Sequence, residues 1–368
     1  MIIMATKKTG ISLDLIIHPG ETISDVLEER GITQAELAAR TGVSPAYISN
    51  VIAGKKDISS KFAMALEYAL GVKKTFWLNL QANYDAELLE LNQEMTITEE
   101  EKHACKALSE VIGHLQKRKI IPVTQRIEET ILSLRKTLQI SNIGNLKNLV
   151  PEGAFRLAQN KSIDSYVMGA WLRICQIIGE KSTVNTCFDP SKVDELIDAI
   201  KAIMVKPKCN IQEELSQTMR QYGIHFAVVQ NFKGAPVHGY ISQKTDGTFQ
   251  MVVTIRGAFA DIFWFSLFHE LGHIVNGDVS KGTKYIDVAE NGNPDQEHAA
   301  DMFAGNALLN EQNYIQFVKY RNFLIDDIKR FAASQKVMPY IVIGRLQKDG
   351  HIPYTWYSRY KLRYKWAE

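Results

Sequence analysis

The chain reads TQAELAARTGVSPAYISNVIAG at residues 33–54, and this stretch decides how its first part folds. Thr33 is a favourable helix N-cap, and Glu36 three residues later completes a capping box. A helix is therefore expected to begin here and to run to Arg40. A tight turn is expected around Gly42, because glycine readily adopts the left-handed conformation that ends a helix.

A second short helix is predicted directly after this turn. Ser44 is a good N-cap, and Pro45 suits the first helical position because an N–H there would have no helical partner. The helix should stop at Gly54. Its inward face is predicted to consist of Ile48, Val51 and Ile52, and its outward face of Pro45, Ala46, Ser49 and Asn50. Two short helices about a glycine turn allow the second to lie in a DNA major groove.

Residues 33–54 resemble the XRE (Cro/repressor-like) class of DNA-binding domains. The wider segment, from His18-Pro19-Gly20-Glu21 to FWLNLQANY at residues 76–84, is similar to the HigA antitoxins. The resemblance implies a transcriptional regulator that binds a double-stranded DNA operator, and it suggests a toxin or another regulator as protein partner. It places Gln34 at a phosphate, and it places at base edges Pro45, Ala46 and Asn50.

The chemistry of these side chains suits DNA. Asn50 can bond bidentately to adenine, whereas Pro45 and Ala46 offer apolar contact to a thymine methyl. The candidates for phosphate contacts are Lys55, Lys56 and Lys61. Residues 1–80 carry nine Lys and Arg against eight Asp and Glu, however, which also fits a helical bundle that binds protein. We expect DNA binding by a homodimer, since each monomer has little excess positive charge.

The second motif is a metal-binding pattern. Residues 261–273 read DIFWFSLFHELGH, an apolar helix that ends in H-E-x-x-H. Helical geometry places His269 and His273 on one face, where both can hold one Zn²⁺ ion. Glu270 is then beside the position of a metal-bound water, as the general base. A later helix over residues 295–309 is expected to supply a third ligand.

Glu297 is the predicted third ligand. Catalytic zinc usually has three protein ligands and leaves the fourth position to water. Glu297 and Asp301 share one helical face, so Asp301 is predicted to accept a hydrogen bond from a ligand histidine. His298 and Glu290 compete with Glu297 for the ligand role. Oxyanion donors that we consider without preference are Tyr240, Arg256 and Tyr285.

These residues resemble the ImmA/IrrE family of metallopeptidases. The similarity rests on FWFSLFHELGHI at residues 263–274, on Glu297 with Ala300-Asp301 and Phe303-Ala304, and on Trp171-Leu172-Arg173 and Gly344-Arg345-Leu346-Gln347. The expected chemistry is peptide hydrolysis: zinc polarises the scissile carbonyl and lowers the pKa of its water, and Glu270 accepts the proton. The resemblance implies DNA-binding regulators as substrates, and cleavage within the chain itself is an alternative.

The sequence predicts an α+β protein that is mainly helical. Its expected parts are a helix-turn-helix domain (18–91), a charge-rich helical linker (94–150), a zincin-like domain with a small β-sheet (151–325), and a C-terminal helix with a basic aromatic tail (326–368). The predicted strands are Ile224–Val229, Val237–Ser242 and Phe249–Ile255, with a hairpin turn at Thr245-Asp246-Gly247. The helices predicted around them are Gly153–Ile178, Val193–Met204, Gln212–Tyr222, Asp261–Asn276 and Asp295–Leu309.

Composition favours a folded cytoplasmic protein. Hydrophobic residues make up 45% and charged residues 23%, and the net charge is only +2. No apolar run approaches the roughly 20 residues of a membrane span, and the four cysteines form no C-x-x-C pair. Residues 335–368 interleave seven Lys and Arg with aromatics, which we interpret as a tail that packs on the preceding domain with its charges solvated, rather than as a DNA contact.

The favoured hypothesis is a regulator that carries its own zinc peptidase domain. One alternative is a regulator whose C-terminal domain is a metal-stabilised sensor or partner-binding module without turnover. Another is a peptidase whose N-terminal domain binds protein. Glu270 favours an enzyme, because a purely structural metal site has no use for a base.

Overall fold

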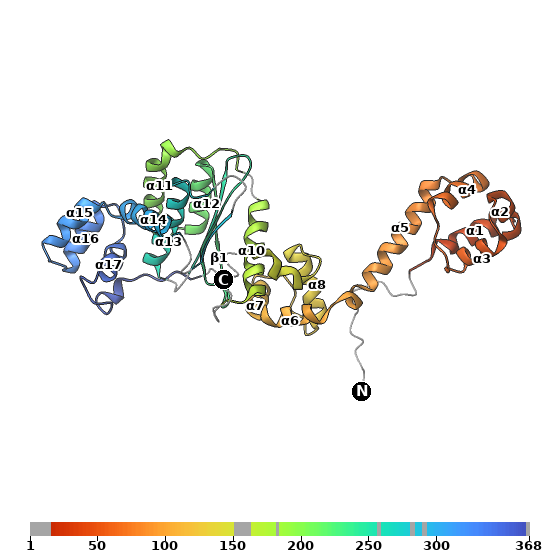
Figure 1. The fold of residues 1–368 in the computed structure, drawn as a ribbon, viewed down its shortest axis with the longest axis horizontal. Coiled ribbons are helices and arrows are strands. Elements are labelled where there is room, and N and C mark those ends of the chain that lie inside the picture. The colour runs from red at the N-terminus through yellow and green to blue at the C-terminus, as the bar shows by residue number, and fades with distance from the viewer. Residues whose placement is uncertain are drawn as a thin grey trace, which may run out of the picture. The chain divides into compact units, whose positions relative to one another are not determined.

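The computed structural model describes residues 16–150, 163–181, 184–255, 259–279, 284–288 and 293–365 (Figure 1). Within them the chain is mainly helical with one small mixed sheet, as the sequence predicts. It divides into two compact units, Met1–Glu99 and Glu100–Glu368. Three residues singled out from the sequence lie outside the described ranges: Gly153, Arg256 and Glu290.

The first unit is a helical bundle that contains the predicted helix-turn-helix. Thr33 Oγ1 accepts a hydrogen bond from Glu36 N, and Ser44 Oγ accepts one from Tyr47 N, both at 3.1 Å, so both N-caps are confirmed. Gly42 has φ +69° and ends the first of the two helices. The helices are α1 (Pro19–Arg30), α2 (Gln34–Thr41), α3 (Pro45–Ile52), α4 (Ser60–Leu70) and α5 (Lys74–Leu91), followed by η2 (Gln93–Thr96).

The core of this unit holds α2 and α3 in place. Ile48 and Val51 are buried as predicted, but Ile52 is only half-buried, which corrects the sequence assignment. Gly20 allows α1 to touch the end of α3, because a Cβ at this position would lie 2.1 Å from the carbonyl oxygen of Val51. Other buried side chains of the core include Ile23, Leu27, Leu37, Phe62, Leu66 and Trp77.

The second unit is built on a mixed sheet in the order β1-β3-β2-β4. The strands are β1 (Ile224–Val229), β2 (Val237–Gln243), β3 (Phe249–Thr254) and β4 (Lys284–Val288). β1 pairs parallel to β3, whereas β2 pairs antiparallel to both β3 and β4. The first three strands agree with the prediction to within a residue, and the sequence analysis did not foresee β4.

Helices cover both faces of this sheet. On one face lies α10 (Ser165–Glu180), whose Cys175 carbonyl accepts a hydrogen bond from Gln250 Nε2 of β3 at 2.5 Å. The opposite face packs against α11 (Val193–Val205), α12 (Ile211–Gln221) and α13 (Ala260–Val275). Side chains of that core include Leu196, Met219, Phe226, Met251 and Leu267.

The segment predicted as a linker packs within the second unit. Glu101 is fully buried and pairs with Arg135 at 2.6 Å. A Cβ at Gly169 of α10 would lie 2.0 Å from the carbonyl oxygen of Leu146, so the segment contacts α10 closely. Its elements are α6 (Glu99–Ala107), α7 (Ser109–Lys117), α8 (Ile127–Leu138) and η3 (Ile143–Leu149).

The residues that follow α14 pack against α13. After α14 (Pro294–Leu308) follow α15 (Glu311–Lys319), α16 (Ile325–Ser334), α17 (Pro339–Lys348) and η5 (Ser358–Tyr360). Tyr364 accepts a hydrogen bond from Trp264 Nε1 at 2.8 Å, so the tail packs on the unit as expected. Lys361 is nearly buried in an ion pair with Asp261 at 2.8 Å, which corrects the expectation that all tail charges are solvated. No helix among the described residues has the length and apolar character that crossing a membrane requires.

Candidate nucleic-acid interface and metal centre

The outward face of α3 is open to solvent. Pro45, Ala46 and Asn50, together with Ser49, are all exposed, and Gln34 is exposed in the first turn of α2. The lysines considered for phosphate contacts, Lys55, Lys56 and Lys61, are also exposed. The side chains selected from the sequence are therefore placed where a duplex could reach them.

Positive charge lies at the C-terminal end of α3. The Lys56 ammonium lies 4.4 Å from the centre of the Tyr47 ring, a cation–π contact that keeps it beside α3. Arg40 of α2 instead pairs with Glu36 at 2.5 Å, so its charge is compensated locally. This face is thus weakly basic, in agreement with the nearly neutral first 80 residues.

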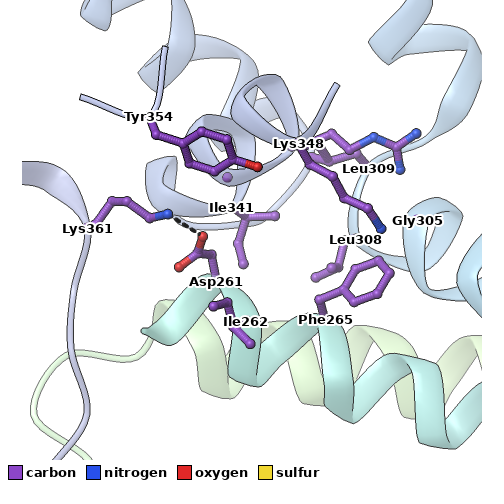
Figure 2. Close-up of a pocket in the computed structure, with 12 residues that line it drawn as sticks. Asp261, Ile262, Phe265, Gly305, Leu308, Leu309, Ile341, Lys348, Tyr354 and Lys361 are labelled. Carbon is purple, nitrogen blue, oxygen red and sulfur yellow. Dashed lines mark ion pairs between the residues drawn. The ribbon is translucent and has the colours of Figure 1, made fainter. Parts of the chain in front are cut away.

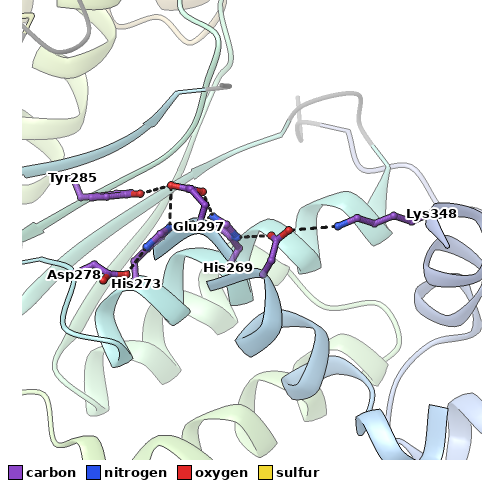
Figure 3. A network of polar contacts seen from close by, with 7 residues as sticks. His269, His273, Asp278, Tyr285, Glu297 and Lys348 are labelled. Atoms are coloured by element: carbon purple, nitrogen blue, oxygen red, sulfur yellow. Dashed lines mark hydrogen bonds and ion pairs between the residues drawn. The ribbon is translucent and has the colours of Figure 1, made fainter. Parts of the chain in front are cut away.

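Helices α13 and α14 bring the three predicted metal ligands together (Figure 3). His269 Nε2 lies 3.1 Å from His273 Nε2 and 3.2 Å from Glu297 Oε2, and His273 Nε2 lies 3.8 Å from Glu297 Oε1. Zinc–ligand bonds of about 2.0–2.1 Å in tetrahedral geometry separate ligand atoms by about 3.3 Å. The donor set fits a zinc ion.

Two carboxylates orient the histidines. His269 Nδ1 lies 2.9 Å from Asp301 Oδ1, as predicted, and His273 Nδ1 lies 2.8 Å from Asp278 Oδ2. Since each Nδ1 donates to a carboxylate, the Nε2 lone pairs of both rings are directed toward the same small volume. The hydrogen bond from His269 lowers the pKa of Asp301, and the ammonium of Lys348 adds to this effect.

The sequence did not predict Asp278 as the partner of His273. It comes five residues after His273, just beyond the end of α13, where Gly277 has φ +77° and turns the chain back. The only sequence signal was an Asn-Gly-Asp turn directly after the H-E-x-x-H helix.

Glu270 is fully buried between α13 and the sheet. Its carboxylate lies against Gly239 of β2, where a Cβ would be 1.9 Å from Oε1. Tyr285 of β4 donates a hydrogen bond to Glu297, and its ring lies 4.3 Å from the His273 ring. Of the oxyanion candidates, Tyr285 therefore lies at the site.

Two other candidates lie away from the metal ligands. Tyr240 is buried on the opposite face of the sheet, where its ring packs against Trp171 of α10, so its candidacy was wrong. His298 is exposed and does not belong to the group that could hold a metal ion, which consists of His269, His273 and Glu297.

Comparison with known proteins relates the first unit to regulators. The helix-turn-helix family model HTH_3 matches residues 23–77. Virulence-associated protein A' of Dichelobacter nodosus is 42% identical over 69 residues, a match covering 18% of this chain and 60% of that protein. The chain thus spans less than two thirds of that relative.

Two further matches cover a similar share of this chain. The uncharacterized HTH-type transcriptional regulator YddM of Escherichia coli K12 is 30% identical over 64 residues, 17% of this chain and 68% of that protein. The solved structure of Pseudomonas aeruginosa antitoxin HigA with higBA promoter is 33% identical, with a TM-score of 0.20, and covers 21% of this chain and 85% of that chain.

Proposed function

Through residues 23–77 the chain belongs to the HTH_3 helix-turn-helix family, and we propose that it is an antitoxin-like transcriptional regulator that binds operator DNA as a homodimer. The observation that carries this proposal is the exposed outward face of α3, which includes Asn50. Because one monomer presents little positive charge, two half-sites are needed for firm binding. A toxin is the first protein partner to test, by co-purification.

The operator can be found by selection from random duplexes with the full chain. Asn50→Ala should then weaken binding to that operator by about 1–3 kcal/mol and relax the preference at one base position. Lys55→Ala should weaken all duplexes alike and reduce the salt slope by about one unit. Asn79→Ala, at an exposed asparagine of α5, is the matched control. If no duplex binds above background at low salt, the proposal of operator binding is refuted.

We further propose that the second unit is a zincin-like, zinc-dependent peptidase domain. The convergence of His269, His273 and Glu297 beside a buried Glu270 supports this assignment. Zinc, when bound, polarises a carbonyl group and lowers the pKa of water. Glu270 would accept a proton at its carboxylate and return it to the leaving amine. Asp301 and Asp278 fix the orientation of the imidazole rings of His269 and His273.

Elemental analysis tests the metal. Wild-type protein should contain about one zinc per chain, and the His269→Ala/His273→Ala double variant should contain none. Full zinc retention in the double variant contradicts the assignment.

Cleavage separates a peptidase from a metal-stabilised module. Glu270→Gln should retain zinc and DNA binding yet lose cleavage by at least about 10²-fold, whereas Glu297→Gln should lose zinc. New termini would be sought by mass spectrometry after co-expression with DNA-binding regulators, and in the chain itself. If Glu270→Gln and wild type give identical fragments throughout, the domain is a sensor or partner-binding module.

A further inference from the structure

A cavity of about 240 Å³ lies between α13, α14 and α17 (Figure 2). Phe265 and Ile262 of α13 form one side, and Tyr354 and Lys348 lie on the opposite side. Its apolar lining consists of Ile262, Phe265, Leu308, Leu309 and Ile341. The Phe265 ring is 6.2 Å from the ring of His269, so the cavity adjoins the candidate metal centre without containing any of its ligands.

One cation of this cavity faces solvent. Lys348 is 60% exposed, and its ammonium lies 4.5 Å from the centre of the Phe265 ring. It forms an ion pair with Asp301 at 3.7 Å, a distance longer than that of a hydrogen bond. An anion entering over Phe265 can therefore reach this ammonium directly.

The remaining charges of the lining are paired. Asp261 is neutralised by Lys361 at 2.8 Å, and Arg345 is paired with Asp349 at 2.7 Å. Lys348 is the most exposed cation of the lining and is paired over the longest distance, 3.7 Å to Asp301, so it is the cation that an incoming anion can reach.

Two glycines in the cavity lining allow Asp261 and Arg345 to pack against the helix backbone. A Cβ at Gly344 would be 2.5 Å from Asp261 Oδ2, and a Cβ at Gly305 would be 2.8 Å from Arg345 Nη1. A side chain at either position would displace the charged group that lies against it. The absence of side chains at both positions keeps the space open.

We propose that this cavity binds a small organic acid, with an aromatic or branched aliphatic body among the apolar side chains and its carboxylate at Lys348. An engineered apolar cavity of about 150 Å³ accommodates benzene, so the larger volume here fits a ring with a short acid chain. Apolar walls with one convergent polar group are typical of small-molecule sites. The residues that line this cavity include none of the three predicted metal ligands and not Glu270.

The probe is 3-phenylpropionate, titrated calorimetrically into the full chain. We expect binding with a Kd of about 1 mM or below. The alcohol 3-phenylpropanol and the amine 3-phenylpropylamine should bind at least about tenfold more weakly. Lys348→Met should weaken the acid about tenfold and leave the alcohol unchanged, as expected for loss of a charge-assisted hydrogen bond. Lys319→Met, at an exposed lysine of α15, should leave the acid's affinity unchanged.

A second pair of variants locates the ligand. Ile262 is 43% exposed in the cavity wall, and Ile315 of α15 is 47% exposed outside it. Ile262→Asp should abolish binding of the acid, whereas Ile315→Asp should preserve it. The proposal is overturned if folded wild type binds no acid at millimolar concentration, if acid, alcohol and amine bind equally, or if the two aspartate variants behave alike. None of these readouts depends on DNA or zinc, so they leave the proposed function untouched.

Discussion

Gly239→Ala is expected to disturb the candidate metal centre through the carboxylate of Glu270. A Cβ at this position of β2 would lie 1.9 Å from Oε1 and 2.0 Å from Cδ of Glu270. Ordinary contacts of this kind are well above 3 Å, so the carboxylate would have to move by more than about 1 Å within a fully buried site. Overpacking of this kind typically costs about 1–3 kcal/mol of folding free energy.

Urea unfolding of the full chain, followed by the fluorescence of the second unit's tryptophans, measures this cost. The matched control is Gly113→Ala in α7, where nothing lies within 4 Å of the added Cβ. That control should be neutral or should stabilise by about 0.5–1 kcal/mol, because alanine replaces glycine inside a helix. Both variants add the same methyl group, so the difference isolates the clash.

A double-mutant cycle with Glu270→Ala identifies the partner in the clash. If the methyl group collides with the carboxylate, the two substitutions should couple by at least about 1 kcal/mol, because the second removes what the first displaces. The reasoning is refuted if Gly239→Ala unfolds at the wild-type urea concentration, or if the two effects add within about 0.5 kcal/mol.

Three other predictions concern the second unit. Lys201 is buried and donates hydrogen bonds to the carbonyl oxygens of Ala307 and Leu308 at the end of α14. Lys201→Met should therefore lower the free energy of unfolding by about 2–3 kcal/mol, measured in urea. The control Lys319→Met should change it by no more than about 0.5 kcal/mol. Burial, aided by nearby Lys244 and Arg220, lowers the pKa of His225 from 6.5 to about 4. As the pH falls, the imidazole is therefore protonated in the unfolded chain before it is protonated in the folded chain. The free energy of unfolding should fall by up to about 3 kcal/mol as the pH drops from 6.5 to 4. In His225→Leu, urea midpoints at pH 4.5 and 7 should differ less than in wild type; an unchanged difference contradicts this. Finally, if the second unit binds zinc as proposed, a chelator should lower the midpoint of its thermal unfolding but not that of the first unit, because the ion would bind only the folded site.

Local chemistry explains what could be predicted from the sequence. The caps at Thr33 and Ser44 and the turn at Gly42 act within a few residues of themselves, so short-range rules sufficed for α2 and α3. The strands β1 and β3 are buried along their whole length because helices cover the sheet on both sides, and short runs rich in apolar residues are recognisable as such strands.

Long-range pairing explains what could not be predicted. β4 has five residues, and its partner β2 lies more than 40 positions earlier in the chain, so no local pattern marks it as a strand. Asp278 meets His273 only because the chain reverses at Gly277, after a helix whose end was not known to one residue. The burial of Lys361 likewise depends on Asp261, a residue 100 positions away.

The choice of Glu297 over His298 rests on how α14 packs against α13. Ala300 and Ala304 are fully buried at this contact, and a Cβ at Gly272 would lie 3.1 Å from the Cα of Ala300. Small residues on both helices therefore fix which face of α14 meets α13. Glu297 precedes Ala300 by three residues and Ala304 by seven, so it lies on that face, whereas His298 is turned by about 100° toward solvent. Imidazole and carboxylate are both good zinc ligands, so helix register rather than ligand chemistry decides between the two side chains.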